Sequence, residues 1–508
     1  MFYPSDMSRE IDFSELLLWN LDREKREKIC FHIPGHNRGV FFDSEFRNRI
    51  IGLDTTELSN SENLHRPGRA LSSLMEKLSE DYGSGCSVLL TTGSTTGIHI
   101  MIASVTSKKG FFLLPRSVHQ SVLSVFTMLN CRYAFIDLPG EDPDFAYPQL
   151  DPESLQSALN RYPQTTDVFL VSPDYFGRSA DLRNLSEVCR KNGCRLLVDE
   201  AHGAHFSYGE GMFPRSAMAS GADISVQSLH KTMPALTMTS LLHIGKEAMR
   251  EGRVSRADIF RKMSMFETSS PSLMLAASAE YAVAWMRENG RISFDRLYSV
   301  IVDFVRRIEM FMGEQDFMHT ELQEKDFTRL VLDTGEWRVF APLIQRELEK
   351  RGVFPEFAEF TKLVFILSPR QREEDLCILH DALVSIYRNI DEIRKEDGGF
   401  PFSKDLWKHC FRHIPRRSME PHEVSFGDHP KEYRPVESAE GYVAAEPIVP
   451  CPPGIPILWP GEIIEKDHTI FLSGMLRGGM DIYGVEQGCV FVFRDGVTRT
   501  YSSAAVRE

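Results

Sequence analysis

The chain has 508 residues, of which 42% are hydrophobic and 26% are charged, and its formal net charge is −14. This composition is typical of a soluble globular protein of two to four domains and excludes a disordered chain. The acidic balance disfavours nucleic acid and anionic membranes as partners, and no apolar run approaches the roughly 18 residues of a membrane span.

The N-terminal segment, "MFYPSDMSREIDFSELLLWN", contains acidic residues and one short apolar run. It resembles neither a signal peptide nor a transit peptide, so we expect a cytoplasmic protein. The nine cysteines are scattered from Cys30 to Cys489 without a CxxC pair, which favours reduced thiols over a disulfide framework or a zinc site.

Six short apolar segments predict the strands of an α/β domain. Helical patterns separate several of them, and in chain order they are "CSVLLTT", "GFFLLP", "RYAFIDL", "DVFLVSP", "CRLLVDE" and "ADISVQS". This alternation is typical of a mainly parallel sheet that is covered by helices. Such sheets bind ligands at the carboxyl ends of their strands, so the residues after each segment are the candidate site residues.

The segment "TTGSTTGIHIMIASV" (91–105) follows the first strand with a turn of glycine and hydroxyl residues that opens an amphipathic helix. Free backbone N–H groups and the positive end of the helix dipole would face an anion there, and a phosphate fits. A Ser/Thr helix cap without a ligand has the same composition. The turn is neither a Walker A loop nor GxGxxG, which disfavours a nucleotide site of either kind.

Residues of other chemistry follow three further strands. His119 comes after "GFFLLP", Asp199 and Glu200 close "CRLLVDE", and Lys231 lies in "SVQSLHKTMPALT" beside His230. The apolar residues around Lys231 predict burial, which is costly for an ammonium unless it is paired or loses its proton. Each residue alone has an ordinary alternative, such as a structural histidine or a solvated carboxylate.

Together these residues predict a site for pyridoxal phosphate. This cofactor carries a phosphate, an aromatic ring, a ring nitrogen whose proton a carboxylate can hold, and an aldehyde that condenses with lysine. We therefore expect Lys231 to be bound as an imine. His202 and His205 have a spacing that metal ligands can have, but further ligands are missing and no metal is expected.

The ordered motifs resemble those of the bacterial ornithine/lysine/arginine decarboxylases, which have the aspartate-aminotransferase fold. The shared segments cover most of residues 30–280 and return near 445–465; they are "FHIPGHNRG", "LDTTELSNSENLHRPGRAL", "TTGSTTG", "PRSVHQS", "VDEAHGAHF", "SLHKTMPALTMTSLLHI", "TSSPS" and "CPPGIPILWPGE". The chain is similar to the shorter members, which lack an N-terminal wing domain. The resemblance implies fold type I of the pyridoxal phosphate enzymes, an α/β fold with a mainly parallel seven-stranded sheet flanked by helices.

The chain is expected to have four parts. They are an N-terminal arm (1–60), a large cofactor-binding domain (61–295), a small α+β domain (296–395) and a C-terminal domain (396–508). In the small domain, "DRLYSVIVDFVRRIEMFM" predicts an amphipathic helix, whereas "FTRLVL" and "TKLVFIL" predict strands. The segment "RKEDGGFPFSK" predicts a linker, and "MEPHEVSFGDHPKEYRP" predicts a loop.

The resemblance also implies roles for individual residues. Lys231 forms the internal aldimine, Asp199 pairs with the pyridinium nitrogen, and His119 and Ala201 pack on the two faces of the ring. Further cofactor contacts are implied for five residues: Ser94, Thr95, His202, Ser228 and His230. Two residues are placed near the distal cationic group of the substrate, Thr268 and Glu462, although a stiff prolyl loop could also carry Glu462 without a role.

The implied activity is decarboxylation of arginine, lysine or ornithine, in a homodimer or larger homo-oligomer that shares its sites through Ser269 and Ser270. The expected catalytic residues are Lys231, His230, Asp199 and His119, and His230 or the freed Lys231 would return the proton to Cα.

The chain departs from the family pattern at four positions, Asn37, Gln120, Leu229 and Met238, where the family usually has Lys, Lys, Thr and Gln. Two alternatives therefore stay open. One is another reaction on the same cofactor, such as transamination or aldol cleavage, and the other is a noncatalytic binding protein of the same fold.

Overall fold

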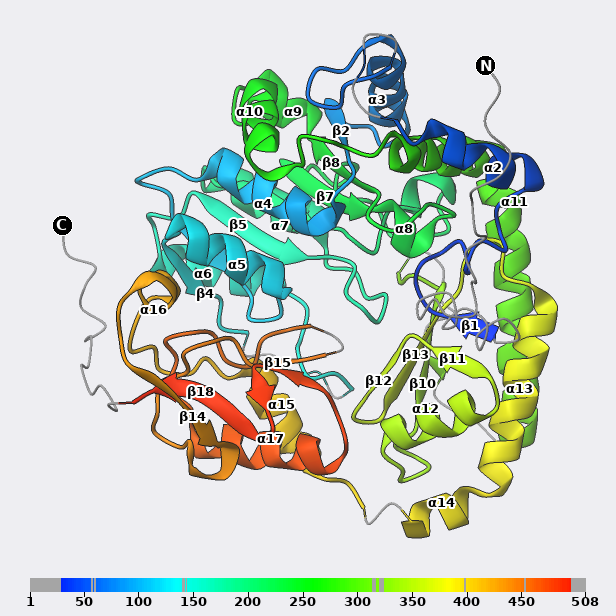
Figure 1. Cartoon of the computed structure of the whole chain (residues 1–508), viewed down its shortest axis with the longest axis vertical. Coiled ribbons are helices and arrows are strands. Elements are labelled where there is room, and N and C mark those ends of the chain that lie inside the picture. Colours follow the sequence, from blue (N-terminus) through cyan, green and yellow to red (C-terminus); the bar gives the residue numbers. More distant parts are fainter. Residues whose placement is uncertain are drawn as a thin grey trace, which may run out of the picture.

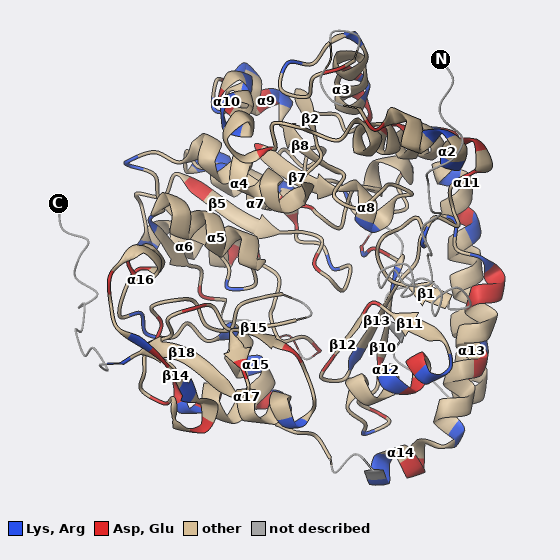
Figure 2. Cartoon of the chain, viewed as in Figure 1, with Lys and Arg blue, Asp and Glu red and all other residues tan. Residues whose placement is uncertain are grey.

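The computed structural model describes residues 29–55, 58, 61–138, 142, 144–312, 317–318, 324–396, 399–451 and 454–494 (Figure 1). Much of the expected N-terminal arm therefore lies outside the described residues. Within the described ranges, no helix has the length and apolar character to cross a membrane. Charged residues concentrate on peripheral helices, whereas the central strands carry few of them (Figure 2).

A seven-stranded sheet forms the centre of the large domain, in the order β2-β8-β7-β6-β5-β3-β4. Neighbouring strands are parallel except for β8, which is antiparallel to both β2 and β7. The strands are β2 (Cys86–Leu90), β3 (Phe112–Leu114), β4 (Tyr133–Phe135), β5 (Asp167–Val171), β6 (Arg195–Asp199), β7 (Ile224–Ser228) and β8 (Ser240–Ile244). All six expected strands are present, and β8, which was not expected, completes the sheet.

Alternate residues of these strands enter two different apolar clusters, which explains why the strands are continuous hydrophobic runs. Leu196 and Val198 of β6 pack with α6 (Pro152–Arg161) and α7 (Leu182–Lys191) on one face. Leu197 packs with the helices of the other face, which are α3 (Arg69–Asp81), α4 (Gly93–Val105), α5 (Gln120–Leu129), α10 (Arg256–Phe266) and α11 (Leu273–Met312).

The small domain contains an antiparallel sheet in the order β12-β13-β10-β9. Its strands are β9 (Phe317–Met318), β10 (Arg329–Asp333), β12 (Phe357–Glu359) and β13 (Lys362–Ile366), and its helices include α12 (Ala341–Lys350), α13 (Glu373–Arg388) and α14 (Ile390–Glu396). A separate parallel pair joins β1 (Ile29–Phe31) to β11 (Val353–Pro355). The expected domain limit at residue 295 falls inside α11, which is one continuous helix of 40 residues.

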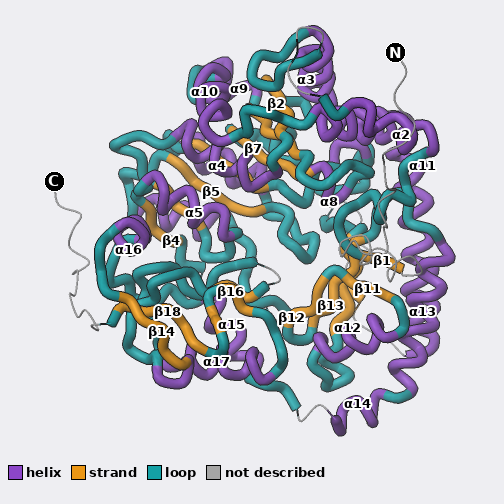
Figure 3. The backbone as a smooth tube through the Cα atoms, in the orientation of Figure 1, coloured by secondary structure: helices purple, strands orange, loops and turns teal. Residues whose placement is uncertain are grey.

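The C-terminal part consists largely of loops (Figure 3). It contains α15 (Lys404–Arg412), α16 (Pro421–Phe426), α17 (Lys466–Arg477), β14 (Lys431–Pro435), β15 (Val449–Pro450), β16 (Ile482–Tyr483), β17 (Val485–Glu486) and β18 (Cys489–Phe493). The loop expected from "MEPHEVSFGDHPKEYRP" was wrong in part, because α16 begins at a proline, which suits the first helical position, and β14 pairs with β18. Shorter elements complete the described ranges: α2 (Ser44–Arg49), α8 (Leu229–Thr232), α9 (Lys246–Arg250), η2 (Ile50–Leu53), η3 (Phe206–Tyr208) and η4 (Val436–Ser438).

Gly97 allows α4 to lie close to the sheet. A Cβ atom at this position would be 2.7 Å from Cγ1 of Val226 and 3.2 Å from Cδ1 of Leu90, and both side chains are buried. We predict that Gly97→Val lowers the free energy of unfolding by about 1–3 kcal/mol, because the added atoms overfill a close-packed core. Urea unfolding measures this, with Ser104→Ala in the last turn of α4 as the control. An equal loss in both variants would contradict the prediction.

Candidate active site

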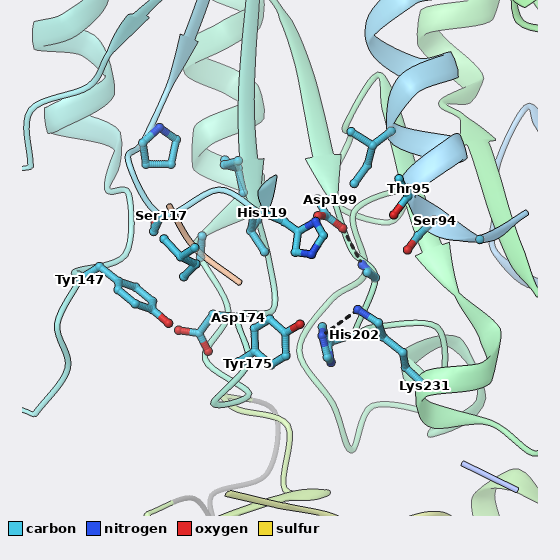
Figure 4. A pocket seen from close by; sticks show the side chains of 18 of the residues that line it. Ser94, Thr95, Ser117, His119, Tyr147, Asp174, Tyr175, Asp199, His202 and Lys231 are labelled. Carbon is cyan, nitrogen blue, oxygen red and sulfur yellow. Dashed lines mark hydrogen bonds between the residues drawn. The ribbon is translucent and has the colours of Figure 1, made fainter. Parts of the chain in front are cut away.

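A cavity of about 360 Å³ lies at the carboxyl end of β6 and extends to the first turns of α4 and α8 (Figure 4). This volume is within the range of small-molecule sites. Its lining includes eight of the residues that the sequence singled out, namely Ser94, Thr95, His119, Asp199, Ala201, His202, His230 and Lys231. Ser228 lies behind this lining and contacts it through Ser94.

The first turn of α4 has the features of an anion site. Thr92, the residue before the helix, makes no side-chain capping hydrogen bond, so the ordinary hydroxyl cap is not formed. The Ser228 hydroxyl donates to Ser94 Oγ at 2.7 Å, which leaves the hydroxyl hydrogen of Ser94 for another acceptor. Since the first backbone N–H groups of a helix also lack intrahelical partners, this turn fits a phosphate.

Asp199 ends β6 as a buried carboxylate, with 4% of its surface exposed. Its Oδ1 atom accepts a hydrogen bond from the backbone N–H of Ala201 at 3.0 Å. Burial raises the pKa of Asp199, and the charge of Lys231 acts in the opposite sense. A carboxylate in this position can hold the proton of a cationic ring nitrogen, which is what pyridoxal phosphate requires.

Lys231 lies in the short helix α8 and is partly buried. Its Nζ atom lies 3.1 Å from Nε2 of His202 and 5.6 Å from the centre of the Tyr175 ring. Burial lowers the pKa of Lys231, Asp199 and Glu356 raise it, and Arg329 lowers it. The amine is therefore closer to its neutral, nucleophilic form than a lysine in water.

Two of the three histidines that line the cavity, His119 and His230, make hydrogen bonds to the backbone. His119 precedes α5, and its Nδ1 accepts the backbone N–H of Ser121 at 3.2 Å. The Nδ1 of His230 lies 3.1 Å from the carbonyl oxygen of Thr239, which can only accept, so this nitrogen carries the hydrogen. Burial lowers the pKa of each ring to about 4, so both imidazoles are neutral at pH 7.

Glu462 requires a correction, because it does not line the cavity of its own chain. Its side chain is almost completely buried, and its Oε1 and Oε2 atoms accept hydrogen bonds from Nη1 and Nη2 of Arg116 at 2.5 and 2.8 Å. Oε2 also accepts the backbone N–H of Trp459 at 2.7 Å. With its carboxylate engaged in this way, Glu462 is an internal counter-ion rather than a substrate contact in this chain.

Thr268 also lies outside the cavity. It is exposed, as are Ser269 and Ser270, and its carbonyl oxygen lies 2.8 Å from Nε2 of His65. The Nε2 atom of His205 pairs with Asp326 at 3.1 Å. Among the residues that the structure describes, no group of His, Cys, Asp and Glu has the arrangement of a metal site.

The loop after β5 contributes residues that the sequence analysis missed. Tyr175 packs its ring on His202, with 4.5 Å between ring centres, and Asp174 lines the same cavity, as does Tyr147 from the segment before α6. Asp174 is engaged by Arg178 and Gln149. The signal was available, since "DYFG" directly follows the expected strand segment "DVFLVSP" and strand ends bind ligands in such sheets.

Three of the four residues that depart from the family pattern have a defined backbone feature, and Leu229 is buried. Met238 has a left-handed backbone (φ +77°), and its carbonyl oxygen accepts the N–H of Gly93 at 2.8 Å, next to the phosphate-like turn. Leu229 is completely buried, and Gln120 donates its N–H to the carbonyl oxygen of Gly454. Asn37 also has a left-handed backbone (φ +45°), which asparagine tolerates.

Comparison with known proteins gives a consistent result. Residues 20–328 match Orn/Lys/Arg decarboxylase, major domain, and residues 404–478 match Orn/Lys/Arg decarboxylase, C-terminal domain. An uncharacterized protein of Bacillus subtilis, YaaO, is 31% identical over 91% of this chain and 94% of its own length. The arginine decarboxylase of the same organism is 27% identical over 92% of this chain and 95% of its own length.

Among solved structures, the Francisella novicida lysine decarboxylase LdcF has a TM-score of 0.74 and 18% identity, and it covers 93% of this chain and 80% of its own. The fold expected from the sequence, fold type I of the pyridoxal phosphate enzymes, is confirmed.

Glu200, the residue after Asp199, has a buried carboxyl group whose raised pKa can be tested. Its carboxylate accepts hydrogen bonds from the Ala217 N–H and the Gln227 amide, both at 2.8 Å, and burial raises its pKa to about 8. The folded protein therefore keeps a proton that the unfolded chain releases near pH 4.5. This contribution to stability is complete below pH 4.5 and is lost as the pH rises towards 8.

We predict that Glu200→Gln reduces the loss of stability between pH 5 and pH 8, because the neutral amide has no proton to release. Urea unfolding of both proteins at the two pH values measures the difference. Other titrating groups, such as Glu359, are shared by the two proteins and cancel in this comparison. The same pH dependence in wild type and variant would show that Glu200 is already ionised in the fold.

Proposed function

Because the chain belongs to the Orn/Lys/Arg decarboxylase family, we propose that it removes the carboxylate of a basic amino acid as CO2 and releases the amine. The family makes the protein a decarboxylase with pyridoxal phosphate as its cofactor. The observation that carries the proposal is the cavity that brings Lys231, Asp199, His119 and the open turn at Ser94 together. A noncatalytic protein would not require these residues to line one cavity.

The proposed roles follow from the contacts in the cavity. When bound, pyridoxal phosphate supplies an electron sink for the pair left by the departing carboxylate. Asp199 would hold the proton on the ring nitrogen, and the N-terminus of α4 with the Ser94 hydroxyl would bind the phosphate. His119 and Ala201 would confine the ring from its two faces, and the apolar lining would exclude water.

Lys231 is the better of the two proposed proton donors to Cα. His230 is neutral at pH 7, its hydrogen lies on Nδ1, and the carbonyl oxygen of Thr239 already accepts that hydrogen. The Nζ atom of Lys231 lines the cavity, and burial lowers its pKa, so its proton is easier to release than that of a lysine in water. We therefore propose that Lys231 returns the proton and that His230 keeps α8 in position.

We propose arginine as the first substrate to test and a homodimer as the active assembly. The relatives named arginine decarboxylase match almost the whole chain at 26–28% identity, whereas the Escherichia coli constitutive lysine decarboxylase is 21% identical. In this assembly, the exposed residues 268–270 would face the cavity of the second copy. The cytoplasmic location expected from the sequence stays a prediction.

Product analysis tests the proposed activity. We expect protein loaded with pyridoxal phosphate to convert arginine, lysine or ornithine to agmatine, cadaverine or putrescine, respectively, as detected by mass spectrometry. Lys231→Ala should produce no amine, whereas Lys246→Ala, at an exposed position of α9, should keep full activity. Absence of all three amines from protein with bound cofactor would contradict decarboxylation and favour another reaction on the same cofactor.

Asp199→Asn tests the carboxylate at the end of β6. The amide keeps the shape of the side chain but cannot stabilise a positive ring nitrogen by charge. We predict that the variant still binds the cofactor, with a loss in kcat on the order of 100-fold, the scale seen when a charge-stabilising group is removed. Steady-state kinetics and the absorbance of bound cofactor measure the two properties. Near-normal turnover would show that Asp199 does not hold the ring nitrogen.

A further inference from the structure

A row of buried polar side chains connects the small domain to Lys231. Arg329, the first residue of β10, is completely buried, and its Nη2 atom lies 3.2 Å from Nδ1 of His202. The other ring nitrogen of His202, Nε2, lies 3.1 Å from Nζ of Lys231. One imidazole thus separates a guanidinium from the amine of the site.

Arg329 is held in place by its own neighbours. Its Nη1 atom donates to Thr328 Oγ1 at 3.1 Å and lies 3.7 Å from Oδ2 of Asp326, and the Thr328 hydroxyl donates to Asp326 Oδ1 at 2.6 Å. His205 and Arg329 lower the pKa of Asp326 to about 2 despite its burial, so this carboxylate is a permanent anchor. Gly177 gives the Arg329 stem room, because a Cβ atom there would lie 3.0 Å from it.

The guanidinium decides which nitrogen of His202 carries the hydrogen. A guanidinium only donates hydrogen bonds, so Nδ1 of His202 must accept. Burial, together with the charge of Arg329, holds the pKa of His202 well below its ordinary value, so the ring is neutral and its hydrogen lies on Nε2. This N–H faces Lys231, and only a neutral amine has a lone pair to receive it.

We propose that Arg329 is a positioning residue that fixes the Nε2–H tautomer of His202 and thereby keeps Lys231 as a neutral amine, ready to condense with the cofactor. This inference rests on the proposed function of Lys231. In the condensation, the Lys231 nitrogen forms a C=N bond to the aldehyde carbon, and the aldehyde oxygen leaves as water. An ammonium has no lone pair for the first of these steps.

The groups around Lys231 determine in which direction its pKa changes when Arg329 is removed. Two carboxylates favour its charged form, Asp199 and Glu356, and Arg329 opposes them. The other neighbouring groups are uncharged at neutral pH: His119, Tyr175, His202 and His230. Without Arg329, His202 is free to present a lone pair to Lys231, and the opposing charge is gone as well. Both changes favour the ammonium, so the pH dependence of condensation should move to higher pH.

The test is the rate at which cofactor-free protein forms its imine with added pyridoxal phosphate, followed by visible absorbance between pH 6 and pH 9. We expect Arg329→Met to condense about tenfold more slowly at pH 7, which corresponds to a rise of one unit in the pKa that controls the amine. At pH 9 the difference from wild type should shrink. Wild-type rates and pH dependence in Arg329→Met would overturn the proposal.

Two matched variants separate this role from simple packing. Arg195→Met removes another arginine from an ion pair with a buried carboxylate, that of Asp167, at the opposite end of β6, and it should leave the pH profile unchanged. Arg329→Lys keeps a cationic donor and should restore most of the wild-type profile. A shift in Arg195→Met, or a shift in Arg329→Lys as large as in Arg329→Met, would overturn the proposal. Arg329→Leu, which also lacks a hydrogen-bond donor, replaces Arg329→Met if the latter does not fold.

The condensation is measured without any amino acid, so its outcome is independent of decarboxylation. A shifted profile in a protein that makes no amine from arginine, lysine or ornithine supports the role of Arg329 and contradicts the proposed reaction. An unshifted profile in a protein that does produce an amine contradicts the role of Arg329 and supports the proposed reaction.

Discussion

The parallel pairing of β6 with β5 and β7 is the constraint on which the site depends. It places Asp199 beside Val171 of β5 and Val226 of β7. The carboxylate therefore lies at the carboxyl ends of the strands, where β7 continues into α8. Lys231 therefore reaches the same cavity without a long loop. Gly97 brings α4 against β7, and the Ser94–Ser228 hydrogen bond closes the phosphate-like turn onto the same strand ends.

Much of this arrangement could be predicted from the sequence, because the strands are buried on both faces and each is a short, continuous apolar run. The rule that ligands bind at strand ends then selected Ser94, His119, Asp199 and Lys231, and all four line one cavity. The strand β8 was the exception, since its run "SLLHI" lay within a motif that was interpreted for its chemistry.

Other features depend on contacts between distant parts of the chain, which no local pattern reports. Arg329 reaches His202 across 127 positions, and Glu462 meets Arg116 across 346. From sequence, Arg329 is one charged residue in a small-domain strand, and Glu462 is a glutamate after a proline-rich segment. The first was overlooked and the second was misplaced for the same physical reason, namely that charge pairing in a core is decided by the tertiary fold.

The pair of Arg116 and Glu462 has a consequence for the independence of the domains. Arg116 belongs to the large domain, packs against the ring of Phe135 at 4.7 Å and donates a second bond to the carbonyl oxygen of Ile457. Neither charge is tolerable in this apolar setting without the other. The C-terminal part is thus an integral section of the interior and not an appended module, so recombination that exchanges it between relatives must carry both halves of the ion pair.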